Sequence, residues 1–253
     1  MDHDTHTNLY HEMAGAAPMV DVGLREHMLS IYKMMTSGML ITAATAWIVS
    51  ALSVSSTPDG QRVMTDFGNA LFGTPLKWVV AFAPLVMLLF AIPMMGRLSS
   101  GAMRAGFYAI AAVFGVSMAS ILLAFTGASI ATAFLATAAG FAGLSIWGYT
   151  TKRDLGPVAS FLVVGLIGLI VVMIVNIFIQ STGVALAVSA IGVLIFAGLT
   201  AADTQRAKQE YLASRFSGEE ALGKMATMSA LSLYLDFLNL FQFLLSFLGV
   251  RRD

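Results

Sequence analysis

The chain has 253 residues, of which 58% are hydrophobic and only 11% are charged. Soluble domains carry about 25% charged residues, so lipid rather than water must cover most of this surface. The formal net charge is zero, which provides no basic excess for nucleic acid. Cysteine is absent, which excludes disulfides, thiol catalysis and thiolate metal sites.

The first 27 residues form a polar segment without the basic start and apolar core of a cleaved signal peptide. The spacing of His3 and His6 is compatible with a metal ion, but a solvated tail is expected because no acidic or cysteine cage accompanies them. We therefore expect a tail over 1–27, a membrane domain over 28–250 and a C-terminal tail over 251–253. The histidines of the first segment are His3, His6, His11 and His27.

Seven apolar runs have the length of a membrane span, which needs about 20 residues. Only helices and closed barrels satisfy their backbone groups in lipid, and these runs lack the alternation of barrel strands. The sequence therefore predicts an all-α membrane protein, a bundle of seven transmembrane helices. The runs are 29–52, 76–96, 105–125, 130–149, 157–179, 184–203 and 229–249.

Basic residues near the ends of the runs predict the orientation. With a cytoplasmic N-terminus, ten of them lie inside and four lie outside, so we expect that orientation and an external C-terminus. If the last run only dips into the membrane, the C-terminus returns inside, which Arg251 and Arg252 would fit. The inside residues are Arg25, Lys33, Arg97, Arg104, Lys152, Arg153, Arg206, Lys208, Arg215 and Lys224, and the outside residues are Arg62, Lys77, Arg251 and Arg252.

The last run carries a polar stripe whose spacing puts all its members on one helical face. Such a face must contact protein or water rather than lipid, so the last helix is expected at the centre of the bundle. Ser232, Asn239 and Gln242 are candidate pore-lining residues, although the stripe is also explained as hydrogen-bonding contacts between helices. The stripe consists of Ser229, Ser232, Asp236, Asn239, Gln242 and Ser246.

Two acids stand out, because ionisable groups within membrane runs are costly and tend to be functional. Asp236 lies inside the last run and Asp203 closes the sixth. A rise of 1.5 Å per residue puts them about 10 Å apart in depth, so whether they meet is open. If they meet, two carboxylates in a dry site share one proton and change charge near neutral pH. Doubly ionised, they offer oxygen ligands to Ca²⁺.

Two arginines are candidate partners for these acids on the same side of the membrane. Arg97 ends the second run and Arg104 starts the third. Either one is able to bond an acid and lock helices together as a closed gate. Each is also explained by itself as an interfacial anchor that follows the positive-inside rule.

The segment Ser232–Phe241, with Asp203-Thr204-Gln205 upstream, resembles the Bax inhibitor family, also called transmembrane Bax-inhibitor-motif proteins. The segment from Val22 to Tyr32 and the stretch Asn176-Ile177-Phe178 are similar too, so the resemblance covers residues 20 to 250. It implies a seven-helix bundle with the last helix in the middle and a pH-sensitive calcium leak. The chain is most similar to the bacterial branch, which implies the cell inner membrane.

The resemblance also implies roles for particular residues. Asp203 and Asp236 match the two aspartates that form the pH sensor. Arg97 is the best match for an arginine that bonds one aspartate in the closed form, and Arg104 is nearby. Some members carry an acid within the second helix, and this chain has none between Lys77 and Arg97, so the role of that acid in cation passage is not carried over.

These features favour a pH-sensitive calcium (cation) leak channel that is not an enzyme. The expected partners are the lipid bilayer, calcium as a permeant ion weakly bound by Asp203 and Asp236, and other membrane proteins, without a resident cofactor. One alternative is a regulatory partner in stress or cell-death control without transport, with 204–228 as its docking surface. Another is an intramembrane aspartic protease, although Leu233-Tyr234-Leu235 provides none of the glycines such enzymes have before their second aspartate.

Overall fold

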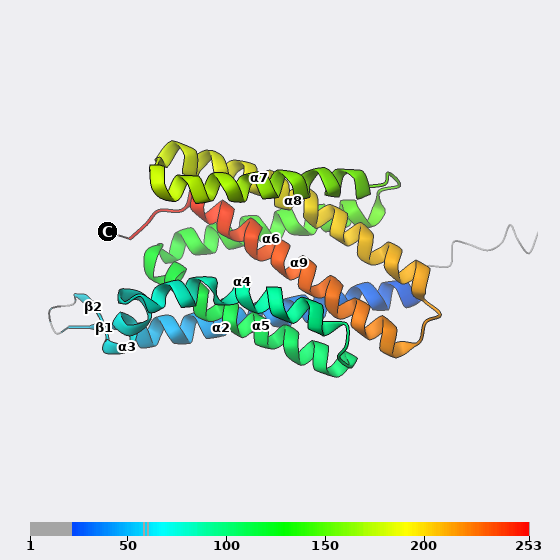
Figure 1. Ribbon diagram of the computed structural model, residues 1–253, viewed down its shortest axis with the longest axis horizontal. Coiled ribbons are helices and arrows are strands. Elements are labelled where there is room, and N and C mark those ends of the chain that lie inside the picture. Colours follow the sequence, from blue (N-terminus) through cyan, green and yellow to red (C-terminus); the bar gives the residue numbers. More distant parts are fainter. Residues whose placement is uncertain (1–21, 58, 60, 253) are drawn as a thin grey trace, which may run out of the picture.

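The computed structural model describes residues 22–252 except 58 and 60, and within them seven long helices form a bundle (Figure 1). All seven are long and apolar enough to cross a membrane, which confirms the expected all-α membrane bundle. His3, His6 and His11 lie outside the described residues. The seven helices are α2 (Val22–Ser53), α4 (Leu76–Met95), α5 (Ser100–Ala124), α6 (Gly127–Thr150), α7 (Gly156–Ile179), α8 (Thr182–Ser214) and α9 (Glu219–Leu248).

Residues on both sides of the segment 28–250 also have regular structure. Helix α2 begins at Val22, so His27 is a buried helix residue whose ring lies 4.9 Å from the ring of Tyr211 in α8. At the other end, Arg251 forms a backbone bridge with Phe125. Regular backbone structure therefore continues past both predicted boundaries.

Helices α8 and α9 include most of the segment 204–228, which lies between the sixth and seventh predicted runs. Helix α8 has 33 residues and α9 has 30; at 1.5 Å per residue both exceed the hydrocarbon thickness of about 30 Å. Gly218, with φ 87°, makes the turn between them in a conformation that favours glycine. The charged segment is therefore a helical hairpin that extends past the apolar part of the bundle.

The connection from α2 to α4 contains a small hairpin that the sequence analysis did not predict. Strand β1 (Val54–Ser56) pairs antiparallel with β2 (Arg62–Met64), followed by α3 (Asp66–Gly68) and the π-helix η1 (Asn69–Gly73). The Thr65 side chain accepts a hydrogen bond from Gly68 N at 3.1 Å and so begins α3. Three-residue strands are too short to give a recognisable alternation of polar and apolar residues.

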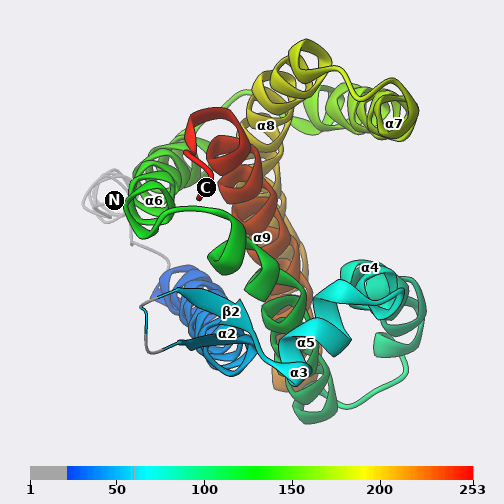
Figure 2. The same cartoon turned by 90° about the vertical axis from the view of Figure 1, so that its left-hand side faces the viewer.

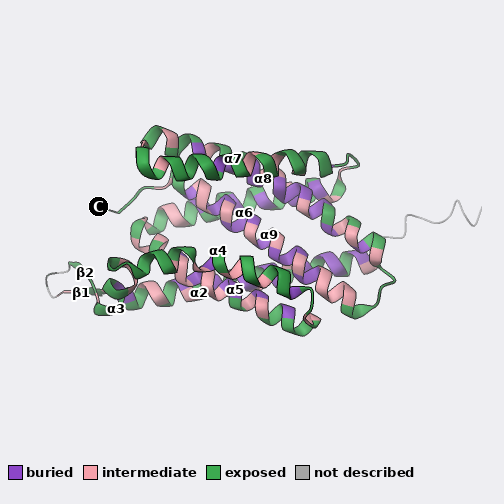
Figure 3. Cartoon of the chain, in the orientation of Figure 1, coloured by how far each residue is buried: buried purple, intermediate pink, exposed green. Residues whose placement is uncertain are grey.

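Helix α9 is central, as its polar stripe predicted. It packs against α2, α5, α6 and α8, whereas α4 packs on α5 and α7 packs on α8 (Figure 2). Buried residues accordingly follow α9, and α4 and α7 are mostly exposed (Figure 3). Because α9 is one continuous helix along the bundle, the alternative of a run that only dips into the membrane does not describe this structure.

Close packing at the centre depends on one tyrosine and on small residues. Tyr234 of α9 is fully buried, with the rings of Phe107 and Phe114 edge-on to it and its hydroxyl 2.7 Å from the Thr42 hydroxyl. Gly148 of α6 approaches the backbone of Ala201 in α8 so closely that a Cβ at Gly148 would overlap the Ala201 carbonyl. Membrane helices use such small residues because packing rather than hydrophobicity drives their association.

Candidate functional site

Asp236 is a buried acid on the central helix. Its residue is 5% exposed, and its Oδ2 atom has no hydrogen-bond partner among the described residues. Its neighbours Leu233 and Phe237 on α9 are also buried. A carboxyl group in this position must stay neutral or interact with another charge, because an isolated ionised group in a dry interior is very costly.

Asp203 of α8 provides that second charge. Its side chain is 17% exposed, and it lies close enough to Asp236 for the two carboxyl groups to interact electrostatically. Helices α8 and α9 form a hairpin and pack against each other, so residues of the two helices face one another. The structure therefore places the two acids on neighbouring helices, within range of an electrostatic interaction.

Arg206 is the cation next to these acids, and sequence reasoning did not identify it as a site residue. Its Nη2 atom lies 3.5 Å from Asp203 Oδ1 and donates a hydrogen bond of 3.2 Å to the Ser232 hydroxyl on α9. Its Nε atom lies 3.6 Å from Glu210 Oε1. The three-residue spacing from Asp203 was the available signal, since residues at i and i+3 are neighbours on a helix.

The expected pairing of Arg97 with an acid is absent from this conformation. Both Arg97 and Arg104 are exposed, and within the described part of the chain neither forms an ion pair with Asp203 or Asp236. Arg97 lies in the turn after α4, where its backbone N donates to Met94 O at 3.0 Å. The reason is the packing of α4, which lies against α5 rather than against the α8–α9 pair.

The two residues after Asp203 have structural contacts. The Thr204 hydroxyl donates to Thr200 O at 2.8 Å and faces Ser145 of α6. The buried Gln205 donates from Nε2 to Arg153 O at 2.7 Å, and its Oε1 accepts from Leu155 N at 2.8 Å. Gln205 thus fixes the loop between α6 and α7 against α8.

The polar stripe of α9 extends along the helix in both directions from Asp236. Ser232, Asn239 and Gln242 are all partly buried, and Asn239 Nδ2 donates to Leu235 O of its own helix at 2.8 Å. Ser246, the last member of the stripe, lines a cavity of about 790 Å³. The stripe thus connects the acids with a cavity at the far end of α9.

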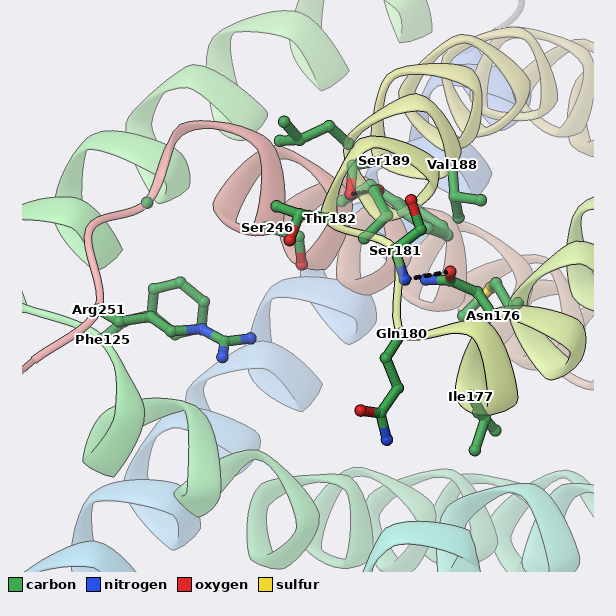
Figure 4. Close-up of a pocket in the computed structure, with 15 residues that line it drawn as sticks. Phe125, Asn176, Ile177, Gln180, Ser181, Thr182, Val188, Ser189, Ser246 and Arg251 are labelled. Atoms are coloured by element: carbon green, nitrogen blue, oxygen red, sulfur yellow. Dashed lines mark hydrogen bonds between the residues drawn. The ribbon is translucent and has the colours of Figure 1, made fainter.

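That cavity lies among α7, α8, the end of α9 and the C-terminal residues (Figure 4). Asn176 accepts a hydrogen bond of 3.1 Å from Ser181 N, at the turn where Gln180 adopts φ 54°. Arg251 also lines it, with its guanidinium 5.8 Å from the centre of the Phe125 ring. The cavity is therefore partly polar, with one cation at its edge.

A resident metal centre has few ligands here. Within the residues that the structure describes, no three or more His, Cys, Asp or Glu side chains are grouped to hold an ion. Ca²⁺ takes six to eight oxygen ligands, and the site offers the Asp203 and Asp236 carboxyl groups with the Ser232 hydroxyl nearby.

Comparisons with known proteins agree with this architecture. The model of the family described as "Inhibitor of apoptosis-promoting Bax1" matches residues 24–253. An uncharacterized protein of Caulobacter vibrioides is 45% identical over 236 residues, covering 92% of each chain. The inner membrane protein YbhL of Escherichia coli K12 is 39% identical over 233 residues, covering 91% of this chain and 94% of the relative. The protein RP147 of Rickettsia prowazekii is 38% identical over 92% of this chain and 93% of the relative.

Proposed function

Because this chain belongs to the Bax inhibitor family, we propose that it is a pH-sensitive cation leak channel with calcium as the permeant ion. The observation that supports this most is the unpartnered Asp236 oxygen, buried on the central helix beside Asp203. Structural acids in membrane helices are normally satisfied by partners, and unsatisfied ones point to proton or ion handling. The protein is a multi-pass membrane protein, and we place it in the inner membrane with a cytoplasmic N-terminus.

The gate would be the contact between α8 and α9 at the acid pair. Two neighbouring carboxyl groups in a poorly hydrated site hold one proton between them. In the closed form we assign that proton to the buried Asp236 and the negative charge to Asp203, which attracts Arg206. A second proton, taken up as the pH falls, would neutralise Asp203. Arg206 would then lose the ion pair that holds its guanidinium group beside Ser232.

The pathway would follow the polar stripe of α9. Asn239 and Gln242 lie between Asp236 and Ser246, which lines the cavity of Figure 4, and Ser232 lies one turn beyond Asp236 in the other direction. In the closed form the partial burial of these residues leaves the pathway narrow. A shift of α9 relative to α8 would widen it, and passing cations would interact with the Asp203 and Asp236 oxygens and the stripe amides.

An enzyme is the weaker proposal for the same two acids. An intramembrane aspartic protease must open a helix near its aspartates to receive a substrate backbone. Helix α9 continues through Asp236 without a break, and Leu233 and Tyr234 next to it are fully buried. These features support a role in ion passage rather than peptide cleavage.

A regulatory role remains a second candidate because of one exposed residue. Phe216 is 90% exposed at the turn of the α8–α9 hairpin, where an aromatic side chain suits insertion into a partner protein. Affinity capture with wild type and Phe216→Ser would test it. Loss of a specific partner with unchanged ion flux would support regulation, whereas identical captured proteins would contradict it.

The channel proposal is tested by calcium flux into vesicles as a function of pH. Asp203→Asn should give high flux at every pH, because Arg206 loses its charged partner. Asp236→Asn should keep the Asp203–Arg206 pair and move the pH response, because the shared proton is gone. Asp154→Asn, an exposed acid in the α6–α7 loop, is the control. If both site variants retain wild-type flux and pH response, the proposal is wrong.

A further inference from the structure

Three cavities between α2 and α6 join into one groove, called here the α2–α6 groove. Both helices pack on α9 (Figure 2). Cavities lie between the two helices. A cavity of about 680 Å³ and one of about 230 Å³ share Met39 and Phe237. The second cavity shares Trp47, Leu122 and Ile130 with a third of about 380 Å³.

The middle of the groove has the dimensions and chemistry of a lipid-chain site. From Trp47 to Met39 it follows α2 for about 12 Å at 1.5 Å per residue, close to one leaflet of a hydrocarbon core about 30 Å thick. Its walls are almost entirely apolar, and methionine side chains adapt readily to a flexible chain. The wall residues include Met39, Ala43, Met118, Phe134, Phe237 and Phe241.

The end of the groove near the C-terminus is basic. Arg62 of β2 and Arg252 both line the third cavity, together with the hydroxyl residues Ser50 and Ser56, and the described lining contains no acid. The Arg252 backbone is held in place because its N donates to Ala124 O at 2.9 Å. Two guanidinium groups beside an apolar channel complement a phosphate that is attached to a hydrocarbon chain.

We propose that this groove binds one anionic glycerophospholipid, with its phosphate at Arg62 and Arg252 and an acyl chain between α2 and α6. Trp47 lies where the apolar and basic parts meet, the position that tryptophan favours at a membrane interface. The chain would end against Phe237, the residue after Asp236. The lipid would therefore support the part of α9 that carries the buried acid, whether or not the protein conducts ions.

Trp47 itself provides the test. The chain has three tryptophans, so Trp78→Phe with Trp147→Phe leaves Trp47 as the fluorescent reporter. In vesicles, chain-brominated phosphatidylglycerol should quench Trp47 more strongly than brominated phosphatidylcholine at equal mole fraction. Arg62→Gln and Arg252→Gln should each lower this preference about fivefold, because one basic residue contributes about 1 kcal/mol to the binding of an anionic lipid. Arg97→Gln, outside the groove, is the charge control.

A second pair of variants tests the apolar part. Ala43 lines the groove and Ala44 is an exposed neighbour on the same helix. Ala43→Phe should reduce quenching by both brominated lipids, whereas Ala44→Phe should not. Equal quenching by the two lipids in the reporter protein would overturn the proposal, as would a preference that survives loss of both arginines. Quenching is measured without ion flux, so this experiment can contradict the lipid proposal while the channel proposal stands, and the reverse.

Discussion

The Arg206 guanidinium donates a hydrogen bond of 3.2 Å to the Ser232 hydroxyl and so links α8 to α9 one helical turn from each acid. The same Nη2 atom lies 3.5 Å from Asp203. A cation that belongs to the protein therefore occupies the position beside the acid pair. In the proposed channel, a passing cation would have to compete with Arg206 for Asp203.

Substitution of Arg206 should raise calcium flux at neutral pH. Its side chain is 57% exposed, and such pairs contribute about 0–1 kcal/mol, so Arg206→Gln should raise flux by about fivefold at most. Arg206→Lys keeps the charge and should give a smaller increase. Flux assays in vesicles measure both, with Arg104→Gln as the exposed control. Unchanged or reduced flux for Arg206→Gln would contradict the role of this link.

Reversal of the charge at Arg251 should increase cation entry from the cavity of Figure 4. An acid at that edge would attract cations where the arginine repels them, and fields of this kind change local association by about tenfold or more. Arg251→Glu should therefore exceed Arg251→Gln, which should exceed wild type, in initial flux at low salt. The differences should shrink at high salt because the Debye length falls to about 3 Å at 1 M. The same flux in all three proteins would exclude this cavity from the pathway.

Loss of the Tyr234 hydroxyl should destabilise the centre of the bundle. That hydroxyl lies 2.7 Å from the hydroxyl of Thr42, which also donates to Ala111 O at 2.9 Å, so the contact joins α9, α2 and α5. Tyr234→Phe should lower the free energy of unfolding by about 1 kcal/mol, measured by titration with sodium dodecyl sulfate. The control is Tyr108→Phe, whose partly buried hydroxyl lies 3.0 Å from Ser37 and should contribute less. A larger loss for Tyr108→Phe would reverse this ranking.

A methyl group at Gly148 should disrupt the crossing of α6 and α8. A Cβ at this position would overlap the Ala201 carbonyl, whereas a Cβ at Gly143 of the same helix has no neighbour within 4 Å. Gly148→Ala should lower the free energy of unfolding by about 1–3 kcal/mol, as overpacking does. Gly143→Ala should be neutral or slightly stabilising, because alanine favours helix. Thermal unfolding in detergent compares them, and equal midpoints would show that α6 is able to move aside.

Several features of this protein follow from the sequence because they are local. The apolar runs predict seven spanning helices, since each span must satisfy its own backbone in lipid. The spacing of Ser229, Ser232, Asp236 and their partners predicts that α9 is central, and the structure confirms it. The segment 204–228 was harder to interpret, because pairs such as Arg206–Glu210 and Lys224–Glu220 support helix in water beyond the apolar runs.

The partners of each group depend on which helices pack together, and only the tertiary structure decides that. Asp203 and Asp236 are both visible in the sequence, but the electrostatic interaction between them requires α8 to pack on α9. Arg206 rather than Arg97 is the partner of Asp203 because α4 packs on α5. The α2–α6 groove likewise combines side chains from α2, β2, α5, α6, α9 and the C-terminus. Hydrophobicity determines how often a chain crosses the membrane, whereas the packing of side chains between helices determines which residues come together inside the bundle.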